Sequence, residues 1–342
     1  MSLIFQENDP SLESQWRALI LFGKNSATYK FAFAKALLEL IDKETTTISL
    51  AQVAPIYVKS ILEHIKANDK QGNSPSSVFL NACRDFNTHT ISYDQLIHLT
   101  EKHGFTNVVD AFQNINGGTI PHRFYEKDYQ GTAKNIVITD HLLQLKESVQ
   151  FTNLNSEVEA RWNLVETAWN LDLNPNLLEV KIDDELNTLF IENNLMRRKD
   201  ITSARASLNG YQKGKCFYSF QDISIVSGSD KLCAVDHFFP HMHKLHLNKN
   251  GANVNGIWNL VLSDHYVNLD KSAKVPEPKY LDRLHKRNEF YIASKHPLGE
   301  TIVNQTGKTP AARIAFLQKQ YNLAVELSIQ KWKPKVELQP LF

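Results

Sequence analysis

The residue types best suited to chemistry lie in three short groups in the second half of the chain. The pair Asp236-His237 ends one apolar run, Asn259 opens a second, and Asn268 and Lys271 follow it. A histidine with a pKa near 6.5 can take a proton from water at neutral pH. Carboxylate and amide oxygens are ligands that a hard divalent cation prefers. Together these residues predict hydrolysis of a phosphodiester by one metal ion and one general base.

Two strands and a helix must position these side chains. Residues 231–236 and 257–262 are short, β-prone runs, and residues 263–273 are more polar and fit a helix that ends before Pro276. Adjacent side chains of an extended strand point to opposite faces. At a strand end this alternation can relax, so we expect Asp236 to face the metal and His237 to face the attacking water.

This constellation resembles the His-Asn-His (HNH) endonuclease family, whose catalytic unit is a ββα-metal fold. The resemblance covers about residues 208–276, and the HNH domain of RNA-guided CRISPR nucleases has a similar site that ends in Asn, Lys-Ser and a nearby Pro. It implies that His237 is the general base and that Asp236 and Asn268 bind the metal. It also implies that Asn259 acts in the catalytic site by fixing the loop that carries His237. Lys271 would contact a phosphate.

The positions that hold a structural zinc in many members of this family differ here. In place of two C-x-x-C pairs, the chain has Cys216 and Ser219, then Asp264 and Val267. One thiolate with these side chains cannot form the tetrahedral site that structural zinc prefers, so we expect no structural zinc. With Asn268 in the last metal position, where other members use His, the site favours Mg²⁺, with Mn²⁺ as an alternative. We expect aromatic packing in place of the zinc, by Phe217, Tyr218, Phe220 and Trp258.

Basic residues flank the candidate site on both sides. The formal net charge is only +1, so affinity for DNA must come from local patches. On a helix, Arg198 and Arg205 would lie seven residues apart and share one face. Two basic flanks would suit a duplex backbone, whereas the alternative is a pair of ordinary solvated faces. The first cluster is Arg197, Arg198, Lys199, Arg205, Lys213 and Lys215, and the second is Lys279, Arg283, Lys286 and Arg287.

Three histidines crowd the segment that follows Pro240. His241, His243 and His246 include an H-x-H spacing that can bind a metal ion. The alternative is a solvated loop that touches phosphate. The residue types leave both interpretations open.

Length, composition and cysteine use bound the class of protein. A chain of 342 residues that is 42% hydrophobic can bury a sizeable core and form two domains. Three scattered cysteines argue against a disulfide framework and for a reducing compartment. We find no signal peptide and no apolar run long enough to span a bilayer, so we expect a cytoplasmic protein with no membrane association.

The expected fold is α+β and mostly α, in four segments. These are a helical N-terminal domain at 1–150, a helical connector at 151–200, the HNH module at 201–290 and a C-terminal helical segment at 291–342. In the connector, Ser156 and Glu159 form a capping-box pattern that predicts a helix start, and residues 183–193 and 201–208 continue the helical pattern. Pro310 is expected to open a C-terminal helix.

The expected function is metal-dependent cleavage of DNA. The resemblance implies a setting in bacterial restriction or phage defence, with an ATPase or other sensor protein as a partner. One alternative is a catalytically silent DNA-binding or assembly subunit, because the lost cysteines indicate a module that has drifted. A further alternative is a nuclease that acts on RNA or on single strands.

Overall fold

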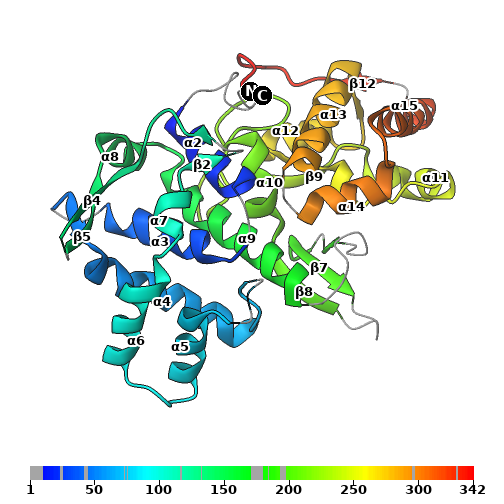
Figure 1. Cartoon of the computed structure of the whole chain (residues 1–342). Coiled ribbons are helices and arrows are strands. Elements are labelled where there is room, and N and C mark those ends of the chain that lie inside the picture. Colours follow the sequence, from blue (N-terminus) through cyan, green and yellow to red (C-terminus); the bar gives the residue numbers. More distant parts are fainter. Residues whose placement is uncertain are drawn as a thin grey trace. The chain divides into compact units, whose positions relative to one another are not determined.

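The computed structural model describes residues 11–23, 26–41, 45–72, 74, 76–115, 118–131, 133–170, 180–183, 185–192, 198–294, 297–328 and 330–342 (Figure 1). Contacts divide the chain into an N-terminal unit, Pro10–Asp172, and a C-terminal unit, Leu173–Phe342. Helices predominate in both units, and small sheets of two or three strands accompany them. The expected α+β class, mostly α, is confirmed.

Two buried helices form the centre of the N-terminal unit. α3 (Tyr29–Leu40) and α4 (Leu50–Ala67) pack against each other. On α3, Phe31, Phe33 and Leu37 are completely buried, so this helix supplies much of the core. The other helices before α9 are α2 (Leu12–Phe22), α5 (Val78–Asn87), α6 (Tyr93–Leu99), η1 (Thr100–Gly104), α7 (Val108–Ala111) and α8 (Asp140–Lys146).

Two small sheets accompany these helices. β1 (Thr47–Ser49), β5 (Ala133–Ile138) and β4 (Tyr125–Gln130) form an antiparallel sheet in the order β1-β5-β4. β2 (Asn114–Ile115) and β3 (Gly118–Thr119) form a short antiparallel pair. The unit is therefore helical with a minor β component.

The long helix α9 (Phe151–Asn170) completes the N-terminal unit and packs on α2 and α3. The expected helix start at Ser156 is wrong, because α9 already begins at Phe151. Glu159, expected to close a capping box, instead contacts side chains of other helices: Lys35 and His64. The capping pattern therefore lies inside a helix, where tertiary contacts decide the role of the glutamate.

The connector contains a sheet where a second stretch of helix was expected. β6 (Lys181–Asp183), β7 (Thr188–Glu192) and β8 (Arg198–Ser203) form an antiparallel sheet in the order β6-β7-β8. The helical interpretation of residues 183–193 and of the start of 201–208 is wrong. Burial of Leu189 and Ile191, two positions apart, follows the period of a strand rather than that of a helix.

The C-terminal unit carries the expected strand and helix order inside a helical frame. α15 begins at Pro310, as expected, with Thr309 as its cap. The backbone N–H of Leu338 donates to the carbonyl of Ser219, so the last residues lie back on this unit. Its elements after β8 are α10 (Ala204–Gln212), β9 (Ala234–His237), η3 (His241–His243), α11 (Lys244–Lys249), η4 (Ile257–Asn259), β10 (Leu260–Ser263), α12 (His265–Lys271), β11 (Val275–Pro276), α13 (Pro278–Ala293), α14 (Pro297–Thr306), α15 (Pro310–Leu327) and β12 (Lys331–Trp332).

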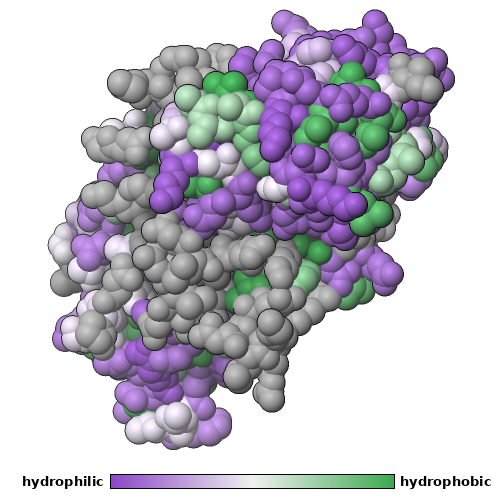
Figure 2. Space-filling model, turned by 90° about the vertical axis from the view of Figure 1, so that its right-hand side faces the viewer, coloured by the Kyte–Doolittle hydropathy of each residue, from purple (hydrophilic) through white to green (hydrophobic). Residues whose placement is uncertain are grey.

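The surface carries only scattered apolar groups on the side shown in Figure 2, where hydrophobic residues form small patches among hydrophilic ones. In the segment between β9 and β10, Met242 and Leu245 are 69% and 80% exposed. Among the helices that the structure describes, none is both long and apolar enough to cross a membrane.

Candidate functional site

β9, β10 and α12 form a strand, strand and helix unit in the C-terminal part of the chain. The two strands are antiparallel, with His237 opposite Leu260 and Asp236 opposite Val261. All four residues of β10 are buried, so this strand lies inside the unit. Asp264 then begins α12, because its Oδ1 accepts hydrogen bonds from the first backbone N–H groups of the helix at 2.9 and 3.1 Å.

Two buried polar side chains hold β10 and the turn before it. The Gln212 amide donates to the carbonyl of Leu262 at 2.7 Å and accepts from its N–H at 2.8 Å. Arg287, which was expected in a DNA-facing cluster, is 1% exposed, and burial lowers the pKa of its guanidinium to about 10. Its role is structural, since it donates to three backbone carbonyls: Ile257, Trp258 and Leu260.

Asn259 fastens the chain just beyond β9. Its side chain is completely buried. The Oδ1 atom accepts from the backbone N–H of Phe239 at 2.8 Å, while Nδ2 donates to the carbonyls of Phe239 and Val254 at 3.1 and 2.8 Å. The backbone carbonyl of Asn259 also accepts from the N–H of Phe238 at 2.8 Å. These bonds fix the segment that directly follows His237.

Asp236 lies in a buried polar group with two partners. Its side chain is 8% exposed. The Tyr218 hydroxyl donates to Oδ2 at 2.6 Å, and the Lys271 ammonium donates to Oδ1 at 3.0 Å. Burial and the nearby carboxylate raise the pKa of Tyr218 well above its usual value, so the phenol stays a donor. The sequence had suggested only packing for Tyr218, and its aromatic surroundings gave no signal of this contact.

His237 combines a fixed backbone with a ring whose Nε2 atom is buried. Its backbone carbonyl accepts from the Lys271 ammonium at 2.7 Å. The imidazole is half-buried, and its ring centroid lies 5.4 Å from that of His241. Because Nε2 is buried, the ring reaches solvent only in part. A general base needs one ring nitrogen within hydrogen-bond reach of water.

Asn268 lies on α12 one turn before Lys271. Residues three apart on a helix share a face, and Lys271 reaches Asp236 from this helix. The face that carries Asn268 is therefore the one that α12 turns toward β9. Asn268 is half-buried.

The two candidate ligands, Asp236 and Asn268, suit a hard divalent cation on the condition that Lys271 first moves away. Asp236 and Asn268 would supply a carboxylate and an amide oxygen, which are ligands of Mg²⁺. A carboxylate has roughly four acceptor positions, and Tyr218 and Lys271 use two of them. Because the Lys271 ammonium already neutralises Asp236, a cation can bind there only after this lysine moves.

A cluster of His, Cys, Asp or Glu side chains would be a different kind of metal site from the pair Asp236 and Asn268. Within the described ranges, no three His, Cys, Asp or Glu side chains come close enough together to hold a metal ion. The expected Mg²⁺ site has one carboxylate and one amide, so it needs no such cluster.

Three of the four positions that the sequence compared with a zinc site make other contacts in the structure: Cys216, Ser219 and Asp264. The Sγ atom of Cys216 lies 3.6 Å from the Ser263 hydroxyl. The Ser219 hydroxyl donates to the side chain of Gln221, and Asp264 caps α12. The expected aromatic packing is present, since the four rings are no more than 1% exposed: Phe217, Tyr218, Phe220 and Trp258.

The three histidines after Pro240 do not act alike. His241 is exposed, next to His237, whereas His243 is 5% exposed. Burial lowers the pKa of His243, and the nearby His246 and Lys271 lower it further. His243 is therefore a neutral, buried residue beside the candidate site rather than part of a solvated loop.

The first basic cluster does not form a common helical face. Arg197 lies outside the described residues, and the side chain of Arg198 in β8 is not described. The expected helix shared by Arg198 and Arg205 is wrong, because β8 ends at Ser203 and α10 begins at the next residue. The Nε of Arg205 donates to the carbonyl of Cys233 at 2.8 Å.

Most of the other expected DNA contacts already have partners within the protein. Lys213 is 4% exposed, and Lys215 forms an ion pair with Asp222 at 2.6 Å. Both Lys279 and Arg283 contact Glu337. Arg283 also donates to the backbone carbonyls of Phe217 and Tyr218. The sequence had suggested two basic flanks for a duplex backbone, but Lys215, Lys279 and Arg283 pair with carboxylates of the protein itself. The completely buried Lys271, which was also expected to contact DNA, likewise has its partners within the protein.

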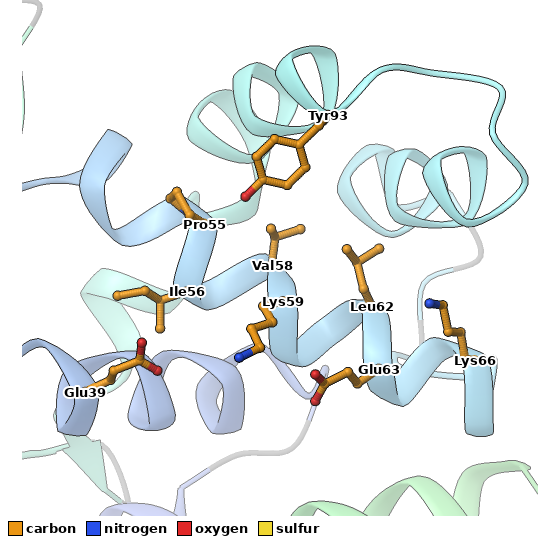
Figure 3. Close-up of a pocket in the computed structure, with 9 residues that line it drawn as sticks. All are labelled: Glu39, Pro55, Ile56, Val58, Lys59, Leu62, Glu63, Lys66 and Tyr93. Atoms are coloured by element: carbon orange, nitrogen blue, oxygen red, sulfur yellow. The ribbon is translucent and has the colours of Figure 1, made fainter.

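The N-terminal unit has a groove of about 440 Å³ between α3, α4 and α6 (Figure 3). Val58 and Tyr93 point toward each other across it. Its charged side chains are two glutamates and two lysines, so it has no dominant charge, and no histidine or cysteine lines it. The lining residues are Glu39, Pro55, Ile56, Val58, Lys59, Leu62, Glu63, Lys66 and Tyr93.

Known proteins give no further guide to this site. Comparisons with protein-family models, with curated proteins and with solved structures find no match to this chain.

Proposed function

We propose that this protein is a metal-dependent endonuclease that hydrolyses DNA phosphodiester bonds. The observation that carries the proposal is the strand, strand and helix unit. It sets the half-buried His237 beside Asp236 and turns the face of α12 that carries Asn268 toward β9. The resemblance of these residues to HNH endonucleases supports the same activity, in bacterial restriction or phage defence beside an ATPase or other sensor.

The residues divide the reaction among them. His237 takes a proton from the attacking water. Asn259 keeps the following segment in place through its bonds to Phe239. Asp236 and Asn268 would hold Mg²⁺ or Mn²⁺, which offsets phosphate charge and stabilises the leaving oxygen when bound.

A catalytically silent DNA-binding subunit is a second candidate. The observation that favours it is the ion pair between Asp236 and Lys271, since a site that no longer binds metal would keep its carboxylate neutralised in this way. Binding of DNA without cleavage in Mg²⁺, Mn²⁺ or Ni²⁺ is the result expected of that candidate.

The test is plasmid cleavage by the full chain with and without Mg²⁺, comparing the wild type with His237→Ala. A positioned general base contributes about 10²- to 10⁴-fold in rate, and we expect the variant to lose this amount. His98→Ala is the matched control, since His98 is exposed on α6 in the other unit. Duplex DNA, single-stranded DNA and RNA are digested side by side to identify the substrate.

Equal cleavage by the His237→Ala and His98→Ala preparations would mean that a contaminant or another site cuts the DNA. Cleavage of RNA alone would retain the nuclease and remove DNA as its substrate. Circular dichroism of both variants shows whether each still folds.

A further inference from the structure

Lys271 is a completely buried lysine at the candidate metal site. Its ammonium donates to Asp236 Oδ1 at 3.0 Å and to the carbonyl of His237 at 2.7 Å, and it lies 5.9 Å from the centre of the Tyr218 ring. Lysine is almost never buried completely unless it is paired. The carboxylate is therefore what keeps this ammonium in the interior.

The ammonium and a divalent cation need the same carboxylate. Mg²⁺ binds oxygen ligands at about 2.0–2.1 Å. An ammonium 3.0 Å from Asp236 Oδ1 would then lie within a few ångströms of the metal ion. Two cations at that separation repel strongly in a poorly hydrated interior. Binding of one at Asp236 must displace the other.

We propose that Lys271 is an internal counter-cation that occupies Asp236 until a divalent cation displaces it, and that the released ammonium then pairs with a phosphate of the nucleic acid. This inference rests on the proposed nuclease function and adds the order of events at its site. DNA gives the displaced ammonium a new partner, so metal and DNA bind cooperatively through Lys271.

The position of Lys271 on its helix allows this exchange. It is the last residue of α12, and the chain leaves the helix at Ser272, whose φ is +48°. Releasing the ammonium therefore moves a long, flexible side chain at a helix end and breaks no hydrogen bond inside the helix. Asn268, one turn earlier, stays in place as the neutral ligand.

The test measures binding of Mn²⁺ to the full chain by calorimetry, for the wild type, Lys271→Met and Lys271→Gln. Removal of a competing charge should tighten binding by a factor within the usual range of coupling between sites, about 5- to 150-fold. Lys271→Gln keeps a hydrogen-bond donor for Asp236, so it covers the case in which Lys271→Met does not fold. Asp236→Asn/Lys271→Met removes both charges and should bind no Mn²⁺ there.

A second measurement needs no substitution. In the wild type, the buried ammonium of Lys271 should give a slowly exchanging side-chain NMR signal, and saturating Mg²⁺ should abolish this protection. Unchanged Mn²⁺ affinity in the lysine variants, or a protected ammonium that persists in saturating Mg²⁺, would overturn the proposal.

Cleavage assays on the same preparations separate this proposal from the nuclease assignment. A wild type that cuts DNA, with lysine variants that bind Mn²⁺ no more tightly, leaves the nuclease and removes the counter-cation. If the wild type never cuts DNA and the lysine variants bind Mn²⁺ tightly, the nuclease assignment is wrong. Lys271 is then still the group that blocks the metal.

Discussion

Each of the two units buries a carboxylate among polar partners. In the N-terminal unit, Glu166 is 2% exposed and accepts hydrogen bonds from His64, Asn68 and Gln71 at 2.8, 2.7 and 2.6 Å. In the C-terminal unit, Asp236 is 7% exposed and accepts from Tyr218 and Lys271. By burial and hydrogen bonding alone, the two carboxylates are alike.

Their neighbours differ in access to solvent. The Glu166 partner His64 is buried and stacks on the completely buried Trp162, with ring centroids 3.5 Å apart. Asp236 instead precedes the half-buried His237 at a strand end and lies beside the helix face that carries Asn268. A buried, satisfied carboxylate by itself indicates structure, whereas an adjacent histidine that is only partly buried makes the same feature a candidate for catalysis.

Neutralising each carboxylate in turn tests this difference between Asp236 and Glu166 most directly. Asp236→Asn should reduce DNA cleavage by about 10²-fold or more, because a metal ligand contributes several kcal/mol to transition-state stabilisation. Glu166→Gln should leave the cleavage rate of the folded protein unchanged. Plasmid nicking, normalised to folded protein by circular dichroism, measures both.

The free energy of unfolding should also depend on Glu166. Removing one member of a buried polar group typically costs about 3–5 kcal/mol, and we expect Glu166→Gln to approach the lower end of this range in urea unfolding. Glu63→Gln on the exposed side of α4 is the control and should change little. If Glu166→Gln lowered cleavage as far as Asp236→Asn, the distinction between the two carboxylates would be lost.

Local spacing allowed the sequence to predict the frame of the candidate site. One strand, strand and helix unit contains the Asp236-His237 pair, Asn259 and the helix with Asn268. The structure forms this order. The buried ion pair of Lys271 with Asp236 could not be predicted. The same carboxylate also binds Tyr218, which lies 53 residues before Lys271 in the chain.

Long-range contacts explain the other differences. A run of charged residues looks like a solvated surface until its partners are known, and Arg283 pairs with Glu337, 54 residues away. The sheet of β6, β7 and β8 was missed because a short run of apolar residues in a sequence does not by itself distinguish a strand from a helix. The pairing of β7 with β8 decides the type of element.

A smaller effect should come from Asn259, the residue that positions His237. Asn259→Ala would leave three buried backbone groups without their side-chain partner, at a cost of about 1–3 kcal/mol. Asn259→Asp keeps the acceptor for the Phe239 N–H and loses the two donors, so it should restore part of the loss. A positioning role predicts a lower kcat with little change in KM, whereas a purely structural role predicts a lower folded fraction with both constants unchanged.

The smallest effect should be a pH dependence of the stability of the N-terminal unit. His64 lies between two carboxylates, with Nε2 3.2 Å from Glu159 and Nδ1 2.8 Å from Glu166. Burial disfavours the charged ring, but the hydrogen bonds to Glu159 and Glu166 outweigh burial and raise the pKa of His64 above 6.5. A raised pKa gives stability that is complete below the unfolded value and is lost as pH rises through the folded value.

We therefore expect the urea midpoint of the N-terminal unit to fall as pH rises from 6.5 through the raised pKa of His64. His64→Gln should remove this slope. Glu159 gives the opposite sign at low pH. Despite burial, its contacts with His64 and then Lys35 lower its pKa to about 2, so its contribution is present above 4.5 and disappears as pH falls toward 2. A wild-type midpoint that stays flat above pH 6.5 would mean that His64 is neutral, and Glu166 would then be held by neutral donors alone.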